Sequence, residues 1–175
     1  MTISTYQQLL ADLAMETGRI TALLASSLRC GPGCDSCCIS FAVFPIEARN
    51  MQEAIVALPP AEKEKLRKKT GKSGDCCPLL LDKLCAIYEA RPVICRTQGL
   101  PLAYVDEERE SIEVSACPLN FGDDFAFSEE NLLFMDAFNS RLFDLNLEYC
   151  VQNGLSTELR IPILDIATKA LDSSR

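Results

Sequence analysis

Ten cysteines and no histidine limit the site chemistry open to this 175-residue chain. Four of them lie within nine residues, at Cys30, Cys34, Cys37 and Cys38. A C-x2-C spacing lets two thiolates reach one metal ion, and closely spaced cysteines also hold iron–sulfur clusters. Without histidine, a zinc or iron site must be built from thiolates, with occasional help from carboxylates. The sequence therefore predicts a metal site made mainly of cysteines.

The other six cysteines are spread through the middle and the end of the chain: Cys76, Cys77, Cys85, Cys95, Cys117 and Cys150. Cysteine is among the most buried residue types, so a lone cysteine often only packs in a core. Cys150 fits that interpretation, because no other cysteine lies near it in the sequence. For Cys76 the packing and binding interpretations both stay open.

The second group of cysteines lies in a long and specific motif. Residues 85–96 read Cys-Ala-Ile-Tyr-Glu-Ala-Arg-Pro-Val-Ile-Cys-Arg, and they follow Cys34-x2-Cys37-Cys38 and Cys77-Pro78. On these residues the chain resembles the YkgJ-type cysteine-cluster family, a zinc- or iron-chelating domain, over about residues 30–117. It departs from the family pattern in having three residues between Cys30 and Cys34 instead of two.

The resemblance implies that metal ions are chelated by eight cysteines. Carried over by position, they are Cys30, Cys34, Cys37, Cys38, Cys77, Cys85, Cys95 and Cys117. We expect at least four of their sulfurs to lie within about 4 Å of one another, since metal–sulfur bonds measure about 2.3 Å. Arg91 and Arg96 flank Cys95 and are expected to offset the thiolate charge. An ion pair between Arg91 and Glu89 or another carboxylate is the alternative.

Three functions from different classes remain open. The first is a zinc site closed by four thiolates, and the second is an iron–sulfur cluster used in electron transfer or in an enzyme. The third is a thiol–disulfide redox protein that uses the neighbours Cys37-Cys38 or Cys76-Cys77. It is the weakest, because thioredoxin-like chemistry uses C-x-x-C in a βαβ setting. No catalytic constellation is recognisable, so the sequence does not favour an enzyme.

Charge and hydropathy limit the partners. The formal net charge of −8 argues against nucleic acid and against an anionic membrane surface. No run of about 18 apolar residues is present, and the first residues lack the basic and apolar regions of a secretory signal. The expected compartment is therefore the cytoplasm, and the expected partner is a metal ion or cluster. The sequence points to no protein partner.

The apolar spacing predicts a helix-dominant α+β fold, and the chain length is typical of one domain, so residues 1–175 are expected to form a single domain. Two long helices, over residues 2–28 and 128–151, are expected to pack on each other and to frame small β-hairpins and the cysteine-rich metal-binding centre. That centre covers about residues 30–117, and helical segments 1–29 and 128–175 flank it. The remaining predictions are helices over 45–58, 61–69 and 162–171, a strand over 39–44, a polar loop over 70–75, and hairpins over 78–88 and 102–115.

Overall fold

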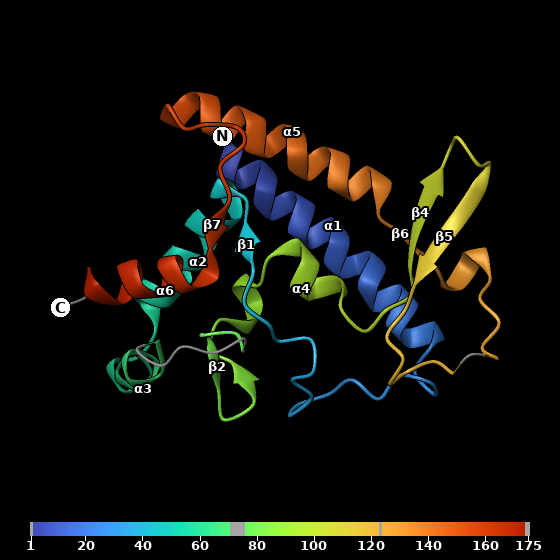
Figure 1. Cartoon of the computed structure of the whole chain (residues 1–175), viewed down its shortest axis with the longest axis horizontal. Coiled ribbons are helices and arrows are strands. Elements are labelled where there is room, and N and C mark those ends of the chain that lie inside the picture. The colour runs from blue at the N-terminus through green and yellow to red at the C-terminus, as the bar shows by residue number, and fades with distance from the viewer. Residues whose placement is uncertain (1, 71–75, 123, 174–175) are drawn as a thin grey trace. The chain divides into compact units, whose positions relative to one another are not determined.

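A computed structural model describes residues 2–70, 76–122 and 124–173 of the chain. Their contacts divide the chain into two compact units, each made of two segments. Unit 1 comprises Met1–Gly31 and Arg96–Leu145, and unit 2 comprises Pro32–Cys95 and Asn146–Arg175. Helices and short strands alternate along the chain (Figure 1), which confirms the predicted α+β class. Of the predicted polar loop over 70–75, residues 71–75 lie outside the described part.

In unit 1 the first helix, α1, runs over Thr2–Leu23. Its apolar face is buried along its length, at Tyr6, Leu9, Leu10, Leu13 and Ile20. The prediction placed its end at residue 28, but the chain turns after Leu23, and the N–H groups of Ser27 and Leu28 both donate to the carbonyl oxygen of Leu24. The helix therefore ends five residues earlier than its apolar spacing indicates.

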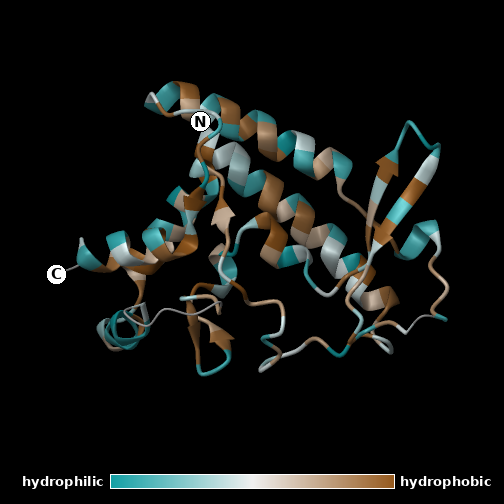
Figure 2. Cartoon of the chain, viewed as in Figure 1, coloured by the Kyte–Doolittle hydropathy of each residue, from teal (hydrophilic) through white to brown (hydrophobic). Residues whose placement is uncertain are grey.

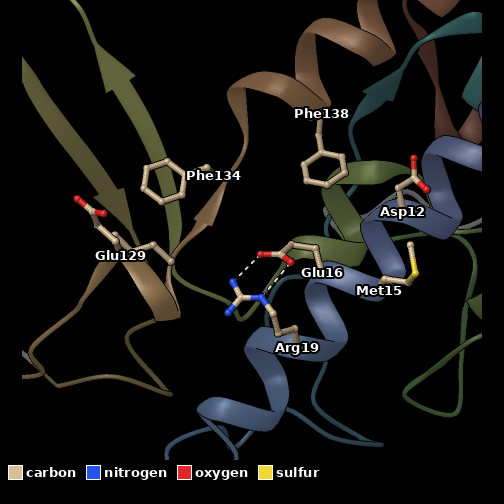
Figure 3. A pocket seen from close by; sticks show the side chains of 8 residues that line it. Asp12, Met15, Glu16, Arg19, Glu129, Phe134 and Phe138 are labelled. Carbon is tan, nitrogen blue, oxygen red and sulfur yellow. Dashed lines mark hydrogen bonds and ion pairs between the residues drawn. The ribbon is translucent and has the colours of Figure 1, made fainter.

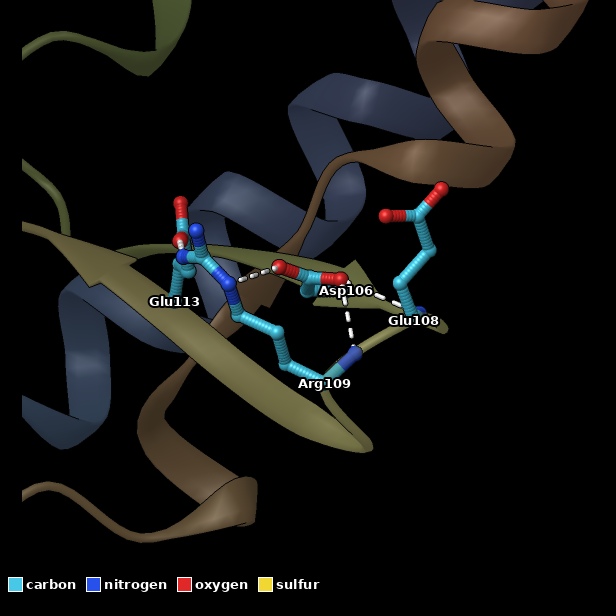
Figure 4. A network of polar contacts seen from close by, with 4 residues as sticks. All are labelled: Asp106, Glu108, Arg109 and Glu113. Atoms are coloured by element: carbon cyan, nitrogen blue, oxygen red, sulfur yellow. Dashed lines mark hydrogen bonds and ion pairs between the residues drawn. The ribbon is translucent and has the colours of Figure 1, made fainter.

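A three-stranded sheet completes unit 1. Strands β4 (Leu102–Asp106) and β5 (Ser111–Ser115) form the second predicted hairpin, which is confirmed, and β6 (Leu133–Phe134) pairs parallel to β4. The side chain of Asp106 organises the hairpin turn (Figure 4). One of its oxygens accepts the backbone N–H groups of Glu108 and Arg109, each at 3.1 Å, and Arg109 also pairs with Glu113 at 3.3 Å.

The predicted helix over 128–151 is wrong in its first part. Residues Glu129–Asn131 form a 3-10 turn, η2, and the helix α5 runs only over Asp136–Asn153. Between them, strand pairing overrides the helical pattern, because Leu133 donates its N–H to the carbonyl oxygen of Pro101 at 2.9 Å. Arg141 of α5 pairs with Asp12 of α1 at 2.7 Å. The apolar packing of these two helices on each other stays a prediction.

Unit 2 contains the other three long helices. These are α2 (Pro45–Ala57), α3 (Pro60–Thr70) and α6 (Ile163–Asp172), and each agrees with its prediction to within a residue at either end. They carry mixed hydrophobic and hydrophilic residues (Figure 2), and the hydrophobic ones meet in a core. Its fully buried members include Met51, Ile55, Leu66, Leu79, Ile163 and Leu171. Cys77 and Cys85 pack against that core.

Short strands and turns carry most of the cysteines of unit 2. Of the predicted strand over 39–44, only β1 (Ala42–Val43) forms, paired antiparallel with β7 (Ile161–Pro162). The first hairpin is confirmed as β2 (Leu80–Leu81) and β3 (Leu84–Cys85). Its turn residues Asp82 and Lys83 have φ values of 50° and 63°, the left-handed pair of a type I′ turn. The 3-10 turn η1 (Tyr88–Ala90) and the short helix α4 (Val93–Thr97) follow.

None of the helices described here combines the length and the apolar character needed to cross a membrane.

Candidate metal centre

The two cysteine-rich segments of unit 2 meet along their backbones. The N–H of Cys77 donates a 2.9 Å hydrogen bond to the carbonyl oxygen of Cys38. Next to it, Ile39 and Cys76 form an isolated antiparallel bridge. Successive residues of an extended pair point to opposite faces, so Cys38 and Cys77 share one face and Ile39 and Cys76 share the other. The pairing thereby places the first cysteine group against the second.

Two further cysteines come from the elements that follow. Cys85 lies on β3, opposite Leu80 of β2. Cys95 lies in the first turn of α4, where its N–H donates to the carbonyl oxygen of Pro92 at 3.0 Å. Cys38, Cys77, Cys85 and Cys95 are all half-buried, and the last of them interacts electrostatically with the other three. We call these four residues the thiol cluster.

Burial sets the protonation of the thiol cluster. It raises the pKa of Cys77 to about 11 and that of Cys95 to about 12, and it also raises the pKa values of Cys38 and Cys85. Neighbouring thiols add to this rise, because several negative charges close together repel one another. At neutral pH and without a bound cation, these thiols therefore hold their protons.

Two of the sulfurs nevertheless face donors that suit a thiolate. The backbone N–H of Leu79 donates to the sulfur of Cys77, and that of Ile87 donates to the sulfur of Cys85. In both cases the donor lies two residues after the cysteine. These contacts lower the two pKa values against the effect of burial. They are the kind of hydrogen bond that supports a metal-bound thiolate.

Arg91 adds a positive charge to this environment, and the pKa values of Cys85 and Cys95 are lower for its presence. This lowering of the two pKa values agrees with the predicted role of Arg91, which is to offset the negative charge of the thiolates. Arg96 is half-buried and belongs to unit 1, and its predicted part stays a prediction.

Three other cysteines of unit 2 are exposed, namely Cys34, Cys37 and Cys76. The segment before Cys38 is a turn, in which the N–H of Cys38 donates to the carbonyl oxygen of Asp35 at 2.9 Å. The thiols of Cys37 and Cys38 are hydrogen-bonded to each other, and burial raises both of their pKa values. Cys37 thus connects the exposed thiols to the thiol cluster.

Glu47 fixes the start of the helix that carries Cys95. Its buried carboxylate accepts the N–H of Val93 at 2.9 Å and the N–H of Phe44 at 3.2 Å. One side chain thereby serves the N-terminal ends of both α2 and α4. The contact to Phe44 follows the capping-box spacing and could have been read from the sequence. The contact to Val93, 46 residues away, carries no local sequence signal.

Unit 1 holds the remaining two predicted ligands, Cys30 and Cys117, and Asn120 links them. The amide of Asn120 donates to the sulfur of Cys30 at 3.2 Å and to the carbonyl oxygen of Gly99 at 2.6 Å. Its own N–H donates to the carbonyl oxygen of Cys117 at 3.0 Å. Asn120 was not among the predicted site residues, and its only sequence signal is its place in a turn after Cys117-Pro118.

Cys150, predicted to pack rather than bind, is completely buried, which confirms its placement in a core. For the other cysteines, the sulfurs are not drawn together around one point. Within residues 2–70, 76–122 and 124–173, no three cysteine, aspartate or glutamate side chains lie close enough to hold one metal ion. The expected approach of four sulfurs to about 4 Å is therefore not found in this part of the chain.

A hollow of about 410 Å³ on unit 1 is lined by charged and apolar side chains (Figure 3). Its acidic residues include Asp12, Glu16 and Glu129. Arg19 pairs with Glu16 at 2.6 Å, and hydrogen bonds from arginines lower the pKa values of both Asp12 and Glu16. These two carboxylates are thus ionised and committed to arginines, which leaves neither poised as a general acid.

Comparison with known proteins gives one match. A family model described as "CxxCxxCC: Putative zinc- or iron-chelating domain" matches residues 29–118, just over half of the chain. The matched range contains every cysteine except Cys150. No curated protein and no solved structure matches the chain.

Proposed function

This chain belongs to the CxxCxxCC family, and we propose that it binds zinc or iron through the thiolates of its thiol cluster. The metal-binding role rests on the family. The observation that carries the choice of ligands is the electrostatic interaction of the half-buried Cys95 with three other half-buried thiols of unit 2. Cys38, Cys77, Cys85 and Cys95 supply the four thiolates that a tetrahedral zinc site or an iron–sulfur cluster uses.

The chemistry of these residues suits such a group. Thiols bind metals only after losing their protons, so the bound metal replaces the protons that burial keeps on Cys77 and Cys95. The N–H donors of Leu79 and Ile87 stay in place to support two of the resulting thiolates. Because the sulfurs are not yet gathered around one point, binding draws the Cys38 turn and the hairpin closer together.

The other cysteines of the matched range complete the proposed chelating set. Cys34 and Cys37 are exposed beside the thiol cluster and are available to a second ion or to exchange with the first. Cys30 and Cys117 lie in unit 1, and we assign them to the set from the family match alone. All eight cysteines of the sequence prediction are therefore kept as ligands.

A thiol–disulfide function is the weaker proposal. A reactive cysteine needs a lowered pKa, because the thiolate is the nucleophile. The pKa values of Cys37, Cys38 and Cys77 are all raised. The pairs Cys37-Cys38 and Cys76-Cys77 are therefore better suited to bind a metal ion than to attack a disulfide.

Metal analysis of protein purified without oxygen tests the proposal. We expect zinc or iron to copurify with the protein. A brown protein with visible absorption would identify an iron–sulfur cluster. A colourless protein that contains zinc would identify a closed thiolate site. Oxygen must be excluded because zinc binds more tightly than iron(II) and can replace it. Cys150→Ser is the matched control and should keep the metal, since that thiol lies in the core. Protein that holds no metal and takes up neither ion would contradict the proposal.

A further inference from the structure

Arg91 is fixed beside the thiol cluster by three contacts. Its guanidinium carbon lies 3.6 Å from the centre of the Tyr88 ring, within the range of a cation–π interaction. Its Nε donates to the carbonyl oxygen of Tyr88 at 2.9 Å, and its Nη1 donates to that of Cys95 at 3.3 Å. The planar fork of an arginine is well suited to such a set of contacts, because it loses little freedom for each hydrogen bond that forms.

The positive charge is thereby held between two ligand-bearing elements. Its Nη1 is held at the backbone of Cys95 in α4, and the 3-10 turn η1, which carries Tyr88, begins three residues after Cys85 of β3. Four thiolates around a divalent ion carry a formal charge of about −2, and removing that charge from water is costly unless donors or cations are close. Two backbone donors are already aimed at the sulfurs of Cys77 and Cys85, and Arg91 adds a cation at the backbone of Cys95.

We infer that Arg91 is a positioning residue that keeps a fixed positive charge beside Cys85 and Cys95 and so strengthens metal binding. Tyr88 holds Arg91 in this position. The inference rests on the proposed function. The ring of Tyr88 is mostly exposed, and it restricts Arg91 without contributing a ligand. Arg91 touches no metal in this assignment. It acts through the charge it presents to the two thiolates.

The test is a titration of the metal-free full-length chain with Co²⁺ at one pH, followed by the sulfur-to-cobalt charge-transfer absorption and by competition with Zn²⁺. We expect Arg91→Gln to weaken Co²⁺ binding by about 10- to 100-fold, the usual effect of losing a residue that supports metal ligands. Arg91→Lys should recover part of the loss, because it keeps the charge but not the fork. Tyr88→Phe should bind like the wild type, and Tyr88→Ala should be weaker.

Arg49→Gln is the matched control, since it removes a positive charge from an exposed arginine of the same unit that is paired with Glu53. Its Co²⁺ affinity should not change. If Arg91→Gln bound Co²⁺ as tightly as the wild type, the inference would be overturned. It would also be overturned if Arg91→Lys bound Co²⁺ as weakly as Arg91→Gln, because the loss of charge would then not be the cause. Wild-type protein that binds neither Co²⁺ nor Zn²⁺ would instead overturn the proposed function.

A folding defect is distinguished by thermal unfolding of the metal-free variants. If Arg91→Gln lowers the melting temperature strongly, the comparison of Tyr88→Phe with Tyr88→Ala still decides the question, because both variants retain the arginine. Tyr88→Ala binding as tightly as Tyr88→Phe would show that the Tyr88 ring has no part in metal binding.

Discussion

Cys77 donates its backbone N–H to the carbonyl oxygen of Cys38 at 2.9 Å, across 39 residues of sequence. This single hydrogen bond ties the first cysteine segment to the second and turns the two side chains toward the same face. The neighbouring pair, Ile39 and Cys76, faces the other way, and both of these side chains are exposed. Adjacent cysteines in the sequence thus have different surroundings, which makes them a natural pair for experiment.

Cys77→Ser should therefore remove the metal, whereas Cys76→Ser should keep it. Cys77 is half-buried, packs on the core and interacts with Cys38 and Cys85, while Cys76 is exposed on the opposite face. Serine is close in size to cysteine but is a poor ligand for zinc or iron. Metal content of the two purified variants gives the answer. Retention of full metal content by Cys77→Ser would show that the centre lies elsewhere.

Metal affinity should increase steeply with pH. Burial keeps the pKa of Cys77 at about 11 and that of Cys95 at about 12, so both thiols are protonated between pH 6 and 8 and must release a proton on binding. Two released protons raise the apparent affinity about 100-fold for each pH unit, and more if Cys38 and Cys85 also release theirs. Zn²⁺ competition titrations at pH 6, 7 and 8 measure the slope. A slope near zero would mean that these thiols are already ionised or are not ligands.

Regular elements of this fold follow from local sequence. The helices α2, α3 and α6 begin close to their predicted positions, because Pro45 and Pro60 are the first residues of α2 and α3, and Pro162 immediately precedes α6. The hairpin of β2 and β3 was likewise predictable from leucines on either side of two polar turn residues. The start of α5 was not, because Ser128-Glu129-Glu130 has the features of a helix N-terminus while Leu133 pairs with a strand far away in the sequence.

The site was predictable in its ligands but not in its supports. The spacing of the cysteines and the family motif identified Cys38, Cys77, Cys85 and Cys95 as candidates, and burial now separates them from the exposed Cys34 and Cys37. Glu47 and Asn120 reach their partners across 46 and 90 residues of sequence. No local pattern indicates a contact that depends on how distant segments fold together.

Removal of the metal should loosen the cysteine segments and leave the helices in place. The large apolar side chains of the helices each contribute about 1.5–3 kcal/mol on burial, so the fold does not depend on the ion alone. The segment 30–38 contains two glycines and a proline, and most of its residues are exposed. Chelation should leave the helical circular dichroism nearly unchanged while hydrogen exchange rises over residues 30–38. A cooperative loss of all helical signal would contradict this, as it would place the metal at the centre of folding.

Glu47→Ala should destabilise the metal-free protein by about 2–4 kcal/mol, because it leaves the buried N–H of Val93 and the partly buried N–H of Phe44 without their acceptor. Glu47→Gln should cost less, since its amide oxygen can still accept one of these hydrogen bonds. Urea unfolding measures both differences. Equal stability of all three proteins would show that solvent satisfies these donors.

The same carboxyl group gives a pH dependence of definite sign. Burial raises the pKa of Glu47 above its ordinary value of 4.5, with the two backbone donors acting against this rise. Its contribution to stability is therefore full below pH 4.5 and is lost as the pH rises through the raised pKa. The Glu47→Gln variant should lack that part of the pH dependence. A wild-type curve that is identical to that of the variant would contradict the raised pKa.

Gly99→Ala should destabilise unit 1, and Gly18→Ala in the same unit should stabilise it. Gly99 has a φ of 94°, in the left-handed region that favours glycine, and a Cβ atom there would lie 2.6 Å from the sulfur of Cys30. The sulfur is held by Asn120, so it cannot move without giving up that hydrogen bond. We expect a loss of at least about 1–3 kcal/mol, the usual cost of a residue forced into such a conformation.

Gly18 provides the matched comparison, because it lies inside α1 and an added Cβ would meet no atom within 4 Å. Alanine is favoured over glycine in a helix interior by about 1 kcal/mol. Urea unfolding of the two variants should therefore give changes of opposite sign. If Gly99→Ala proved as stable as the wild type, the close approach of Gly99 to Cys30 would be wrong, and so would the arrangement in which Asn120 links Cys30 to the turn after Cys117.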